Sequence, residues 1–367
     1  MKIPQFKPYI GAEEYKNIKE CFDNNWVTEG KKSKEFVNQL NELVGVKYGV
    51  LAPNGTLSLY LGLKALGIGS GDEVIVPNFS FYASASSVIM AGAKPVFAEV
   101  DIENLQVNIN QVEKKITRKT KAIMPVHVYG MSCDIEKIMQ LSKKYKLKII
   151  EDAAQGIGLK YKGKHVGSFG EIGSFSFFAD KTITTAEGGY LCTDSQDIYN
   201  KLLYLRNQGR INRGSFIHPE LGFNFRMNDI QSSMGLAQLK KLDFIIKAKN
   251  ENYALYNQNL KQEKFKIIKP IEGSTFVPFR IAILFDDIFQ KEKTEKELNL
   301  GGVETRTFFY PLDRQPQFKR KYNLFFKPKK DSVSLSLYKK GLCLPSYVGL
   351  SEKEITYICK KINESIL

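Results

Sequence analysis

The sequence is poor in the residues that build disulfide frameworks and metal sites. Its 367 residues include only five cysteines and three histidines, all scattered along the chain. It contains no CxxC pair, and an odd number of cysteines argues against a disulfide framework. We therefore expect no structural zinc site and predict a reduced, intracellular protein.

Long hydrophobic runs and nucleotide-binding glycine motifs are also missing. The first ten residues, MKIPQFKPYI, lack the apolar stretch of a signal peptide, and no later segment approaches the length of a membrane span. The glycines of residues 67–72 do not have the dinucleotide spacing, and no GxxxxGK[ST] motif occurs. These absences predict a soluble, cytoplasmic protein that has no P-loop and no contact with a membrane.

Positive charge is what the sequence has in excess. The formal net charge is +15 and the isoelectric point is about 9.3. Such a surface attracts nucleic acid, anionic lipid or a phosphorylated metabolite, although a solvated lysine-rich surface is an equally ordinary explanation. No run of lysines and arginines is long enough for a nucleic-acid-binding tail, so we expect no nucleic-acid partner.

Short apolar segments alternate with helical patterns along the first half of the chain. Strand-helix-strand repetition with apolar residues on both strand faces predicts an α/β fold with a mixed, mostly parallel sheet between helices. The predicted strands are residues 48–53, 73–77, 94–100, 121–129, 148–152, 174–178 and 188–193, and the predicted helices between them are 56–66, 81–92 and 134–146.

The two ends of the chain have a different character. Residues 12–45 predict two helices around the loop at 24–30, and a long helical pattern without a later glycine or proline break begins near residue 230. We interpret that pattern as the connector into a second, smaller α/β domain. The predicted domains are 1–244, which combines the N-terminal segment and the large domain, and 245–367.

Lys181 lies in the segment FFADKTITTAEGG, between a predicted strand and a glycine turn. Lysine is seldom buried without a partner, so its position suggests an amine with a chemical task. A buried lysine can form a Schiff base with an aldehyde when burial or nearby charge lowers its pKa.

Several polar residues follow the predicted strands, where ligands bind in parallel sheets. Gly55 and Thr56 open a helix and could hold an anion, although an ordinary helix cap has the same sequence. Asp152 ends a strand and could pair with a protonated pyridine nitrogen, and Gln155 could donate to a neighbouring ring oxygen; an N-cap is the alternative. Ser176 could face a phosphate or simply fill space.

Together these residues supply what pyridoxal 5'-phosphate (PLP) chemistry needs. That chemistry takes a lysine amine, an acidic partner for the pyridine nitrogen and a cradle for the phosphate. Each signal is weak by itself, but their conjunction in one chain predicts a PLP enzyme.

Longer motifs carry a resemblance to a known family. The chain resembles the DegT/StrS family of PLP-dependent nucleotide-sugar aminotransferases, whose members have the type I, aspartate-aminotransferase-like fold. The matching segments are NNWVTEG, PNGTLSLYLGLKALGIGSGDEVIVP, DAAQGIGLKYKGK, GSFGEIGSFSFF, KTITTAEGG, GFNFRMNDIQSSMGLAQL, GVETRTFFYPL and CLPSY.

The resemblance implies a role for each matching residue. Lys181 would bond to the cofactor and later move the proton, and Phe81 would stack on the ring. The phosphate would be held by residues of this chain and by one residue of a partner subunit, so that the enzyme would be a homodimer with shared active sites. The implied phosphate contacts are Gly55, Thr56, Ser176 and the partner's Asn224, and the candidates for the sugar nucleotide are Thr28, Arg226 and Tyr310.

The reaction that the resemblance implies is transfer of the amino group of glutamate to a 4-keto-6-deoxy sugar nucleotide. The segment around Lys181 is most similar to members that convert GDP-4-keto-6-deoxy-D-mannose to GDP-perosamine. Asp180, Ala186 and Asp313 depart from the family pattern, where Asn, Gly and often His stand. These departures leave open a dTDP- or UDP-linked acceptor and, less favoured, amination at C3.

Two other functions stay open at this point. A 3-dehydratase would use the same cofactor, but that branch of the family has histidine in place of the lysine. A non-catalytic PLP-binding regulator predicts a damaged cofactor set or an added DNA-binding segment, and the sequence has neither feature.

Overall fold

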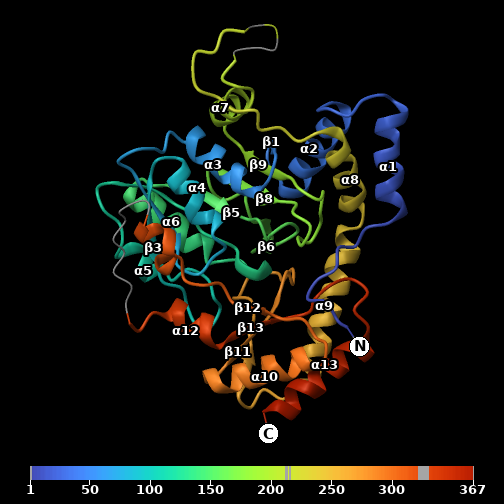
Figure 1. Ribbon diagram of the computed structural model, residues 1–367. Coiled ribbons are helices and arrows are strands. Elements are labelled where there is room, and N and C mark those ends of the chain that lie inside the picture. Colours follow the sequence, from blue (N-terminus) through green and yellow to red (C-terminus); the bar gives the residue numbers. More distant parts are fainter. Residues whose placement is uncertain (1, 211–213, 215, 321–329, 367) are drawn as a thin grey trace.

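A computed structural model describes residues 2–210, 214, 216–320 and 330–366. The chain forms two lobes, each built around its own sheet (Figure 1). The first lobe contains a seven-stranded sheet with strand order β1-β9-β8-β5-β4-β2-β3, and the second contains a four-stranded sheet with order β10-β11-β13-β12.

The seven-stranded sheet confirms the predicted mixed, mostly parallel architecture. Only β9 runs antiparallel to its neighbours, because it pairs antiparallel with both β1 and β8 while the remaining pairs are parallel. Its strands are β1 (Tyr48–Ala52), β2 (Glu73–Pro77), β3 (Lys94–Ala98), β4 (Thr120–Ile123), β5 (Lys148–Asp152), β8 (Ile172–Ser176) and β9 (Gly189–Thr193).

Apolar side chains on both faces of these strands explain the layers. Val50 and Ala52 of β1 pack on one side, and Leu51 packs on the other. The period of two in a strand sends neighbours to opposite faces, so a strand that is apolar throughout needs helices on both sides. One face carries α3 (Gly55–Ala65), α4 (Ala83–Met90) and α7 (Gln196–Arg206); the other carries α2 (Lys31–Val44), α5 (Ile109–Glu113), α6 (Ile135–Tyr145) and α8 (Asp229–Lys240).

The second lobe is an antiparallel sheet backed by helices. Its strands are β10 (Phe265–Ile267), β11 (Ile281–Phe285), β12 (Arg306–Thr307) and β13 (Gly341–Leu344), and β12 is an edge strand. One sheet face packs on α9 (Leu242–Asn259), α10 (Ile288–Leu300) and α13 (Glu352–Ser365). The other face contributes Ala282 and Leu284 to a core shared with Phe79 and Val126 of the first lobe, so the lobes meet through packed side chains.

The remaining elements are short or peripheral. They are α1 (Ala12–Asp23), α11 (Pro316–Arg320), α12 (Val333–Lys340), the 3₁₀ helices η1 (Val128–Gly130) and η2 (Leu312–Arg314), and the hairpin of β6 (Lys160–Tyr161) and β7 (Lys164–His165). The described helices include none with the length and hydropathy that a membrane crossing requires.

The long helical pattern that begins near residue 230 is two helices, not one. The chain turns at Lys241 between α8 and α9, and the Lys241 ammonium lies 2.8 Å from Glu14 of α1. This contact joins the turn to α1, a tertiary contact that the local sequence does not show. In Figure 1, α9 runs from the upper lobe to the lower one, and the boundary near residue 244 stays a prediction.

Candidate active site

Lys181 occupies a tight turn directly after β8. The Lys181 N–H donates to the Phe178 carbonyl at 2.9 Å, which closes the turn, and Phe177 is fully buried beneath it. The Lys181 side chain is only 15% exposed, and its Nζ lies 4.7 Å from the centre of the Phe279 ring and 3.9 Å from Asp180 Oδ1. Burial lowers the pKa of the Lys181 amine, against the pull of Asp180 and Asp152. A lowered amine pKa suits a lysine that acts as a nucleophile.

Asp152 is the buried carboxylate of the same cavity. It ends β5, and its Oδ2 accepts from the Ser84 hydroxyl at 2.7 Å while its Oδ1 accepts from the Ala154 N–H at 3.2 Å. Burial raises the pKa of the Asp152 carboxyl despite these hydrogen bonds. A cation placed beside it, such as a protonated ring nitrogen, would offset the cost of that burial.

Gln155 is oriented by a strained piece of backbone. Its Oε1 accepts from the Tyr129 N–H at 2.7 Å, so the amide nitrogen is the group left to donate. Tyr129 is buried with φ +58°, a left-handed conformation that costs a residue with a side chain about 1 kcal/mol. Backbone strain of this kind concentrates at functional sites.

The start of α3 forms an open cradle opposite Asp152. Asn54 caps the helix by accepting from the Leu57 N–H, and the first N–H groups of a helix have no partner inside it. A Cβ added to Gly55 would lie 2.7 Å from Ser176 Cβ, so a larger residue would close the gap between the helix and β8. The Thr56 and Ser176 hydroxyls line the same cavity. Helix N–H groups, helix dipole and hydroxyls together suit a phosphate.

These side chains line one cavity of about 540 Å³ between the two lobes. The first lobe supplies residues at the carboxyl ends of its strands, and the second lobe adds the ends of β11, β12 and β13. Seven predicted cofactor residues lie in its wall: Gly55, Thr56, Phe81, Asp152, Gln155, Ser176 and Lys181. The Phe81 ring is 60% exposed, which leaves a flat aromatic face open to a ligand.

Four other predicted site residues lie outside this cavity. Asn224 and Arg226 are on the segment before α8, where Arg226 Nε donates to Asn224 Oδ1 at 2.8 Å. Thr28 is in the loop between α1 and α2, and its carbonyl accepts from the Asp229 N–H. Tyr310 follows the cavity residue Phe309 and packs edge-on against Tyr338. A single chain therefore does not bring these four residues to Lys181.

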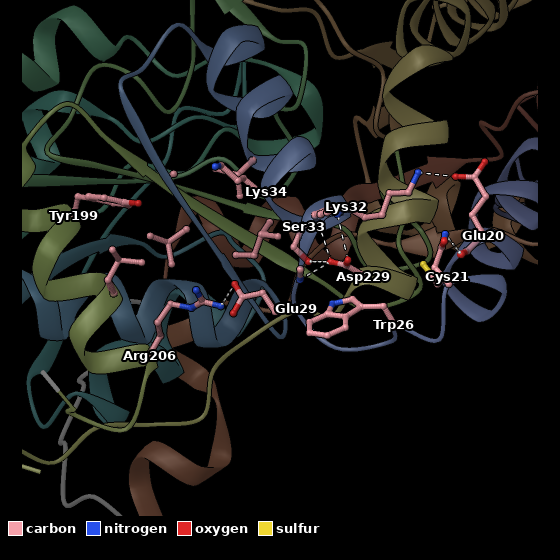
Figure 2. Close-up of a pocket in the computed structure, with 18 residues that line it drawn as sticks. Glu20, Cys21, Trp26, Glu29, Lys32, Ser33, Lys34, Tyr199, Arg206 and Asp229 are labelled. Carbon is pink, nitrogen blue, oxygen red and sulfur yellow. Dashed lines mark hydrogen bonds and ion pairs between the residues drawn. The ribbon is translucent and has the colours of Figure 1, made fainter. Parts of the chain in front are cut away.

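A larger cavity of about 780 Å³ lies along β1, between the α1–α2 loop and α7 (Figure 2). Its carboxylates already have partners inside the fold. Glu29 pairs with Arg206 at 2.7 Å, and Glu20 pairs with Lys32 at the same distance. Asp229 accepts from the Ser33 hydroxyl and from backbone N–H groups of the loop. We find no chemical task for these groups, because each one stabilises the local fold.

Sequence reasoning missed several residues of the smaller cavity. Ser84, which holds Asp152, and Tyr129, which holds Gln155, act through contacts that a sequence does not show. Arg280 and Arg306 reach the cavity from the second lobe. The only sequence signal was the departure from the family pattern at Asp180, which pairs with Arg280 at 2.6 Å.

The comparisons with known proteins agree with this geometry. The chain matches the DegT/DnrJ/EryC1/StrS aminotransferase family over residues 8–363. It is 38% identical to the GDP-perosamine synthase of Escherichia coli O157:H7, covering 99% of this chain and 98% of that protein. It is 37% identical to the GDP-perosamine synthase of Vibrio cholerae, covering 98% of each.

A solved structure shows the same fold. The Spr1654 protein of Streptococcus pneumoniae in its PMP form superimposes with a TM-score of 0.94 at 25% identity, covering 100% of this chain and 98% of that one. The same protein is also known in a PLP form. The protein described here thus has the type I fold of PLP-dependent aminotransferases. It belongs to the DegT/DnrJ/EryC1/StrS aminotransferase family, and the enzymes of this family depend on PLP.

The cavity fits that cofactor in three independent ways. Gly55 lets the start of α3 approach Ser176 where a Cβ would clash, Asp152 is a buried carboxyl with a raised pKa, and the Lys181 amine is buried in the same cavity. A phosphate, a ring nitrogen and an aldehyde are the complementary groups of PLP. Among the described residues no cluster of metal-ligating side chains competes with this reading.

Proposed function

We propose that this protein transfers the amino group of glutamate to C4 of GDP-4-keto-6-deoxy-D-mannose, which yields GDP-perosamine. The observation that carries the transfer chemistry is the placement of Lys181 and Asp152 in one cavity with a phosphate cradle. The choice of acceptor rests on full-length similarity to three proteins named GDP-perosamine synthase, at 34–38% identity. A dTDP- or UDP-linked 4-keto sugar is the alternative acceptor.

The cofactor would be held by the residues that line the cavity. Gly55, Thr56 and Ser176 would bind its phosphate, Phe81 would stack on its ring, and Gln155 would donate to the ring hydroxyl. Asp152 would keep the ring nitrogen protonated. When bound, PLP supplies an electron sink and carries the amino group between the two halves of the reaction.

Lys181 has two tasks in this proposal. Its Nζ would hold the cofactor through the aldehyde, and the same amine would move a proton to and from the substrate carbon. The lowered pKa of the Lys181 amine supports the first task, because the neutral amine is the nucleophile that attacks an aldehyde. A 3-dehydratase is disfavoured because histidine stands at this position in that branch of the family.

A second copy of the chain would complete the site. Asn224 and Arg226 lie outside the cavity of their own chain, and Asn224 would reach the partner's cofactor phosphate while Arg226 would contact the sugar nucleotide. Thr28 and Tyr310 are further candidates for that substrate. We propose that the working unit is a homodimer with shared active sites and that this homodimer is cytoplasmic.

Two half-reactions test the proposal. Glutamate is expected to remove the visible absorbance of the purified enzyme, and the GDP-linked keto sugar is expected to restore it. The dTDP- and UDP-linked sugars, assayed in parallel, identify the nucleotide. The Lys181→Ala variant should lose turnover by several orders of magnitude. An unchanged spectrum with glutamate would contradict the aminotransferase proposal.

A further inference from the structure

The second lobe contributes two arginines to the Lys181 cavity, and their surroundings differ sharply. Arg280, just before β11, is 4% exposed. Its Nη2 donates to Asp180 Oδ2 at 2.6 Å and its Nη1 donates to Gln5 Oε1 at 2.7 Å. Both arms of this guanidinium are therefore bound within the fold, and a ligand would have to break strong, charge-assisted hydrogen bonds to reach it.

Arg306 is less constrained. It lies on the edge strand β12, its side chain is 52% exposed, and its guanidinium sits 5.5 Å from the centre of the Phe6 ring. Its Nη1 is 3.8 Å from Asp180 Oδ2, which is too long for a hydrogen bond. Arg306 is therefore oriented by an aromatic face and a nearby charge while its N–H donors remain available at the cavity wall.

The charge balance explains why two arginines stand beside one aspartate. Asp180 Oδ1 lies 3.9 Å from Lys181 Nζ, so its carboxylate would repel an anion that approaches the amine. Arg280 neutralises that carboxylate through the 2.6 Å contact. The positive charge of Arg306 is then left over for an incoming anion.

We propose that Arg306 binds the α-carboxylate of the amino donor, an inference that rests on the proposed function. An α-carboxylate is one bond away from the carbon that carries the transferred nitrogen, so it must lie close to the Lys181 amine. The Arg306 guanidinium lies 3.8 Å from one oxygen of Asp180, and the Lys181 amine lies 3.9 Å from the other oxygen of the same carboxylate. Arg306 is therefore close enough to the Lys181 amine to bind a carboxylate next to the reacting carbon. The diphosphate of a sugar nucleotide lies farther from its reacting carbon, because the sugar ring separates the two.

The planar guanidinium also suits this ligand. Its parallel N–H groups match the two oxygens of a carboxylate, a geometry that lysine does not offer. The Phe6 ring holds the plane of the guanidinium from one side. Arg306 would thus select an α-amino acid over a simple amine as the nitrogen donor.

The test separates the two half-reactions of the PLP-loaded enzyme. Replacing Arg306 with Met should raise the glutamate concentration for half-maximal loss of visible absorbance by about 10- to 100-fold, the usual worth of a charged hydrogen bond. The Arg306→Lys variant should recover only part of this loss. Restoration of the absorbance by the keto sugar should keep its concentration dependence. Arg118→Met, at an exposed site on another surface, is the matched control and should behave like the wild type.

A binding measurement that needs no turnover completes the test. Glutarate has both carboxylates of glutamate but no amine, so calorimetry reports its binding alone. Wild type should bind glutarate, and Arg306→Met should bind it at least about ten-fold more weakly. The inference would be overturned if the Arg306→Met variant bound glutarate as tightly as the wild type and required no more glutamate than the wild type. A loss confined to the keto-sugar half-reaction would also overturn it and would assign Arg306 to the diphosphate. A wild type that glutamate does not bleach would instead refute the proposed function.

Discussion

The two cavities described above differ in how their charged groups are used. The larger one, shown in Figure 2, has three carboxylates, and each is paired or hydrogen-bonded within the fold. The smaller one contains a buried lysine whose nearest carboxylate oxygen is 3.9 Å away, and Asp180 Oδ1 lacks a hydrogen-bond partner among the described residues. Volume therefore does not locate the chemistry. The chemistry is located by buried charged groups that the fold leaves incompletely paired, because a ligand can offset the free-energy cost of burying them.

The largest effect is expected from replacing Asp152, the buried carboxylate of the smaller cavity. The Asp152→Asn variant keeps the shape of the side chain but cannot hold a ring nitrogen protonated. We expect kcat to fall by about 10²- to 10⁴-fold, with the cofactor still bound through Lys181 and the phosphate cradle. Steady-state kinetics and the visible spectrum measure the two quantities. Wild-type kcat in Asp152→Asn would remove Asp152 from the proposed chemistry.

The second prediction concerns the pH dependence of stability and the buried side chain of His165, whose ring nitrogens are both hydrogen-bonded within the fold. His165 Nε2 accepts from the Gly158 N–H at 2.8 Å, and its Nδ1 donates to the Val166 carbonyl, so the neutral ring uses both nitrogens. Burial lowers the pKa of His165 from 6.5 to about 4. Between these values the unfolded chain binds more protons, so stability is complete above pH 6.5 and falls as the pH drops toward 4, by about 3 kcal/mol in all.

Chemical denaturation between pH 7 and pH 5 measures this loss. The His165→Gln variant is the control, since glutamine does not titrate, and the stability difference between wild type and variant should shrink as the pH falls. A difference that is independent of pH would show that His165 titrates normally.

A smaller effect is expected from the larger cavity. The Asp229→Ala variant removes an acceptor that holds Gly30 and Ser33 of the α1–α2 loop, at a cost of about 2 kcal/mol in unfolding free energy. Asp229→Asn should retain part of that stability. Neither variant is expected to lower kcat by the factor seen for Asp152→Asn. Equal losses of kcat at Asp229 and Asp152 would erase the distinction between the two cavities.

The smallest expected effect is a change in unfolding free energy at Ala186, which lies beside the smaller cavity. Ala186 has φ +66° in the loop that leads to the cavity residue Glu187. A left-handed alanine is strained, so Ala186→Gly should raise the unfolding free energy by about 0.5 kcal/mol once the greater entropy of unfolded glycine is subtracted. Ala186→Val should lower it. Thermal denaturation of the three proteins checks this order, which would be reversed if the loop backbone were unstrained.

That Gly55, Asp152 and Lys181 lie together could be predicted from the sequence, because their placement follows local rules. Asp152 ends β5, Gly55 follows β1 and Lys181 follows β8, and the carboxyl ends of parallel strands meet at one edge of a sheet. The seven strands of the sheet were also predicted, but the predicted strand 121–129 ends at Ile123, and α5 and the β6–β7 hairpin were not predicted. The break at Lys241 was not predicted either, because it depends on a contact with Glu14 that is more than 200 residues away in the chain.

The part of the cavity wall that the second lobe supplies could not be predicted from the sequence. Arg280 comes just before β11 and Arg306 lies on β12, both in the second lobe, and only the packing of the two lobes brings them to Asp180. The sequence marked Asp180 as a departure from the family pattern but did not indicate its partner. Contacts between distant segments have no periodicity or spacing from which they could be inferred.

The central claim is that one amine, Lys181 Nζ, bonds to the cofactor. Reduction of the PLP-loaded protein with borohydride fixes that bond, and mass spectrometry of its peptides locates it. We expect a pyridoxyl group on the peptide that contains Lys181, and none in the Lys181→Ala variant. A pyridoxyl group on a different lysine of the wild type, or on no lysine, would contradict it.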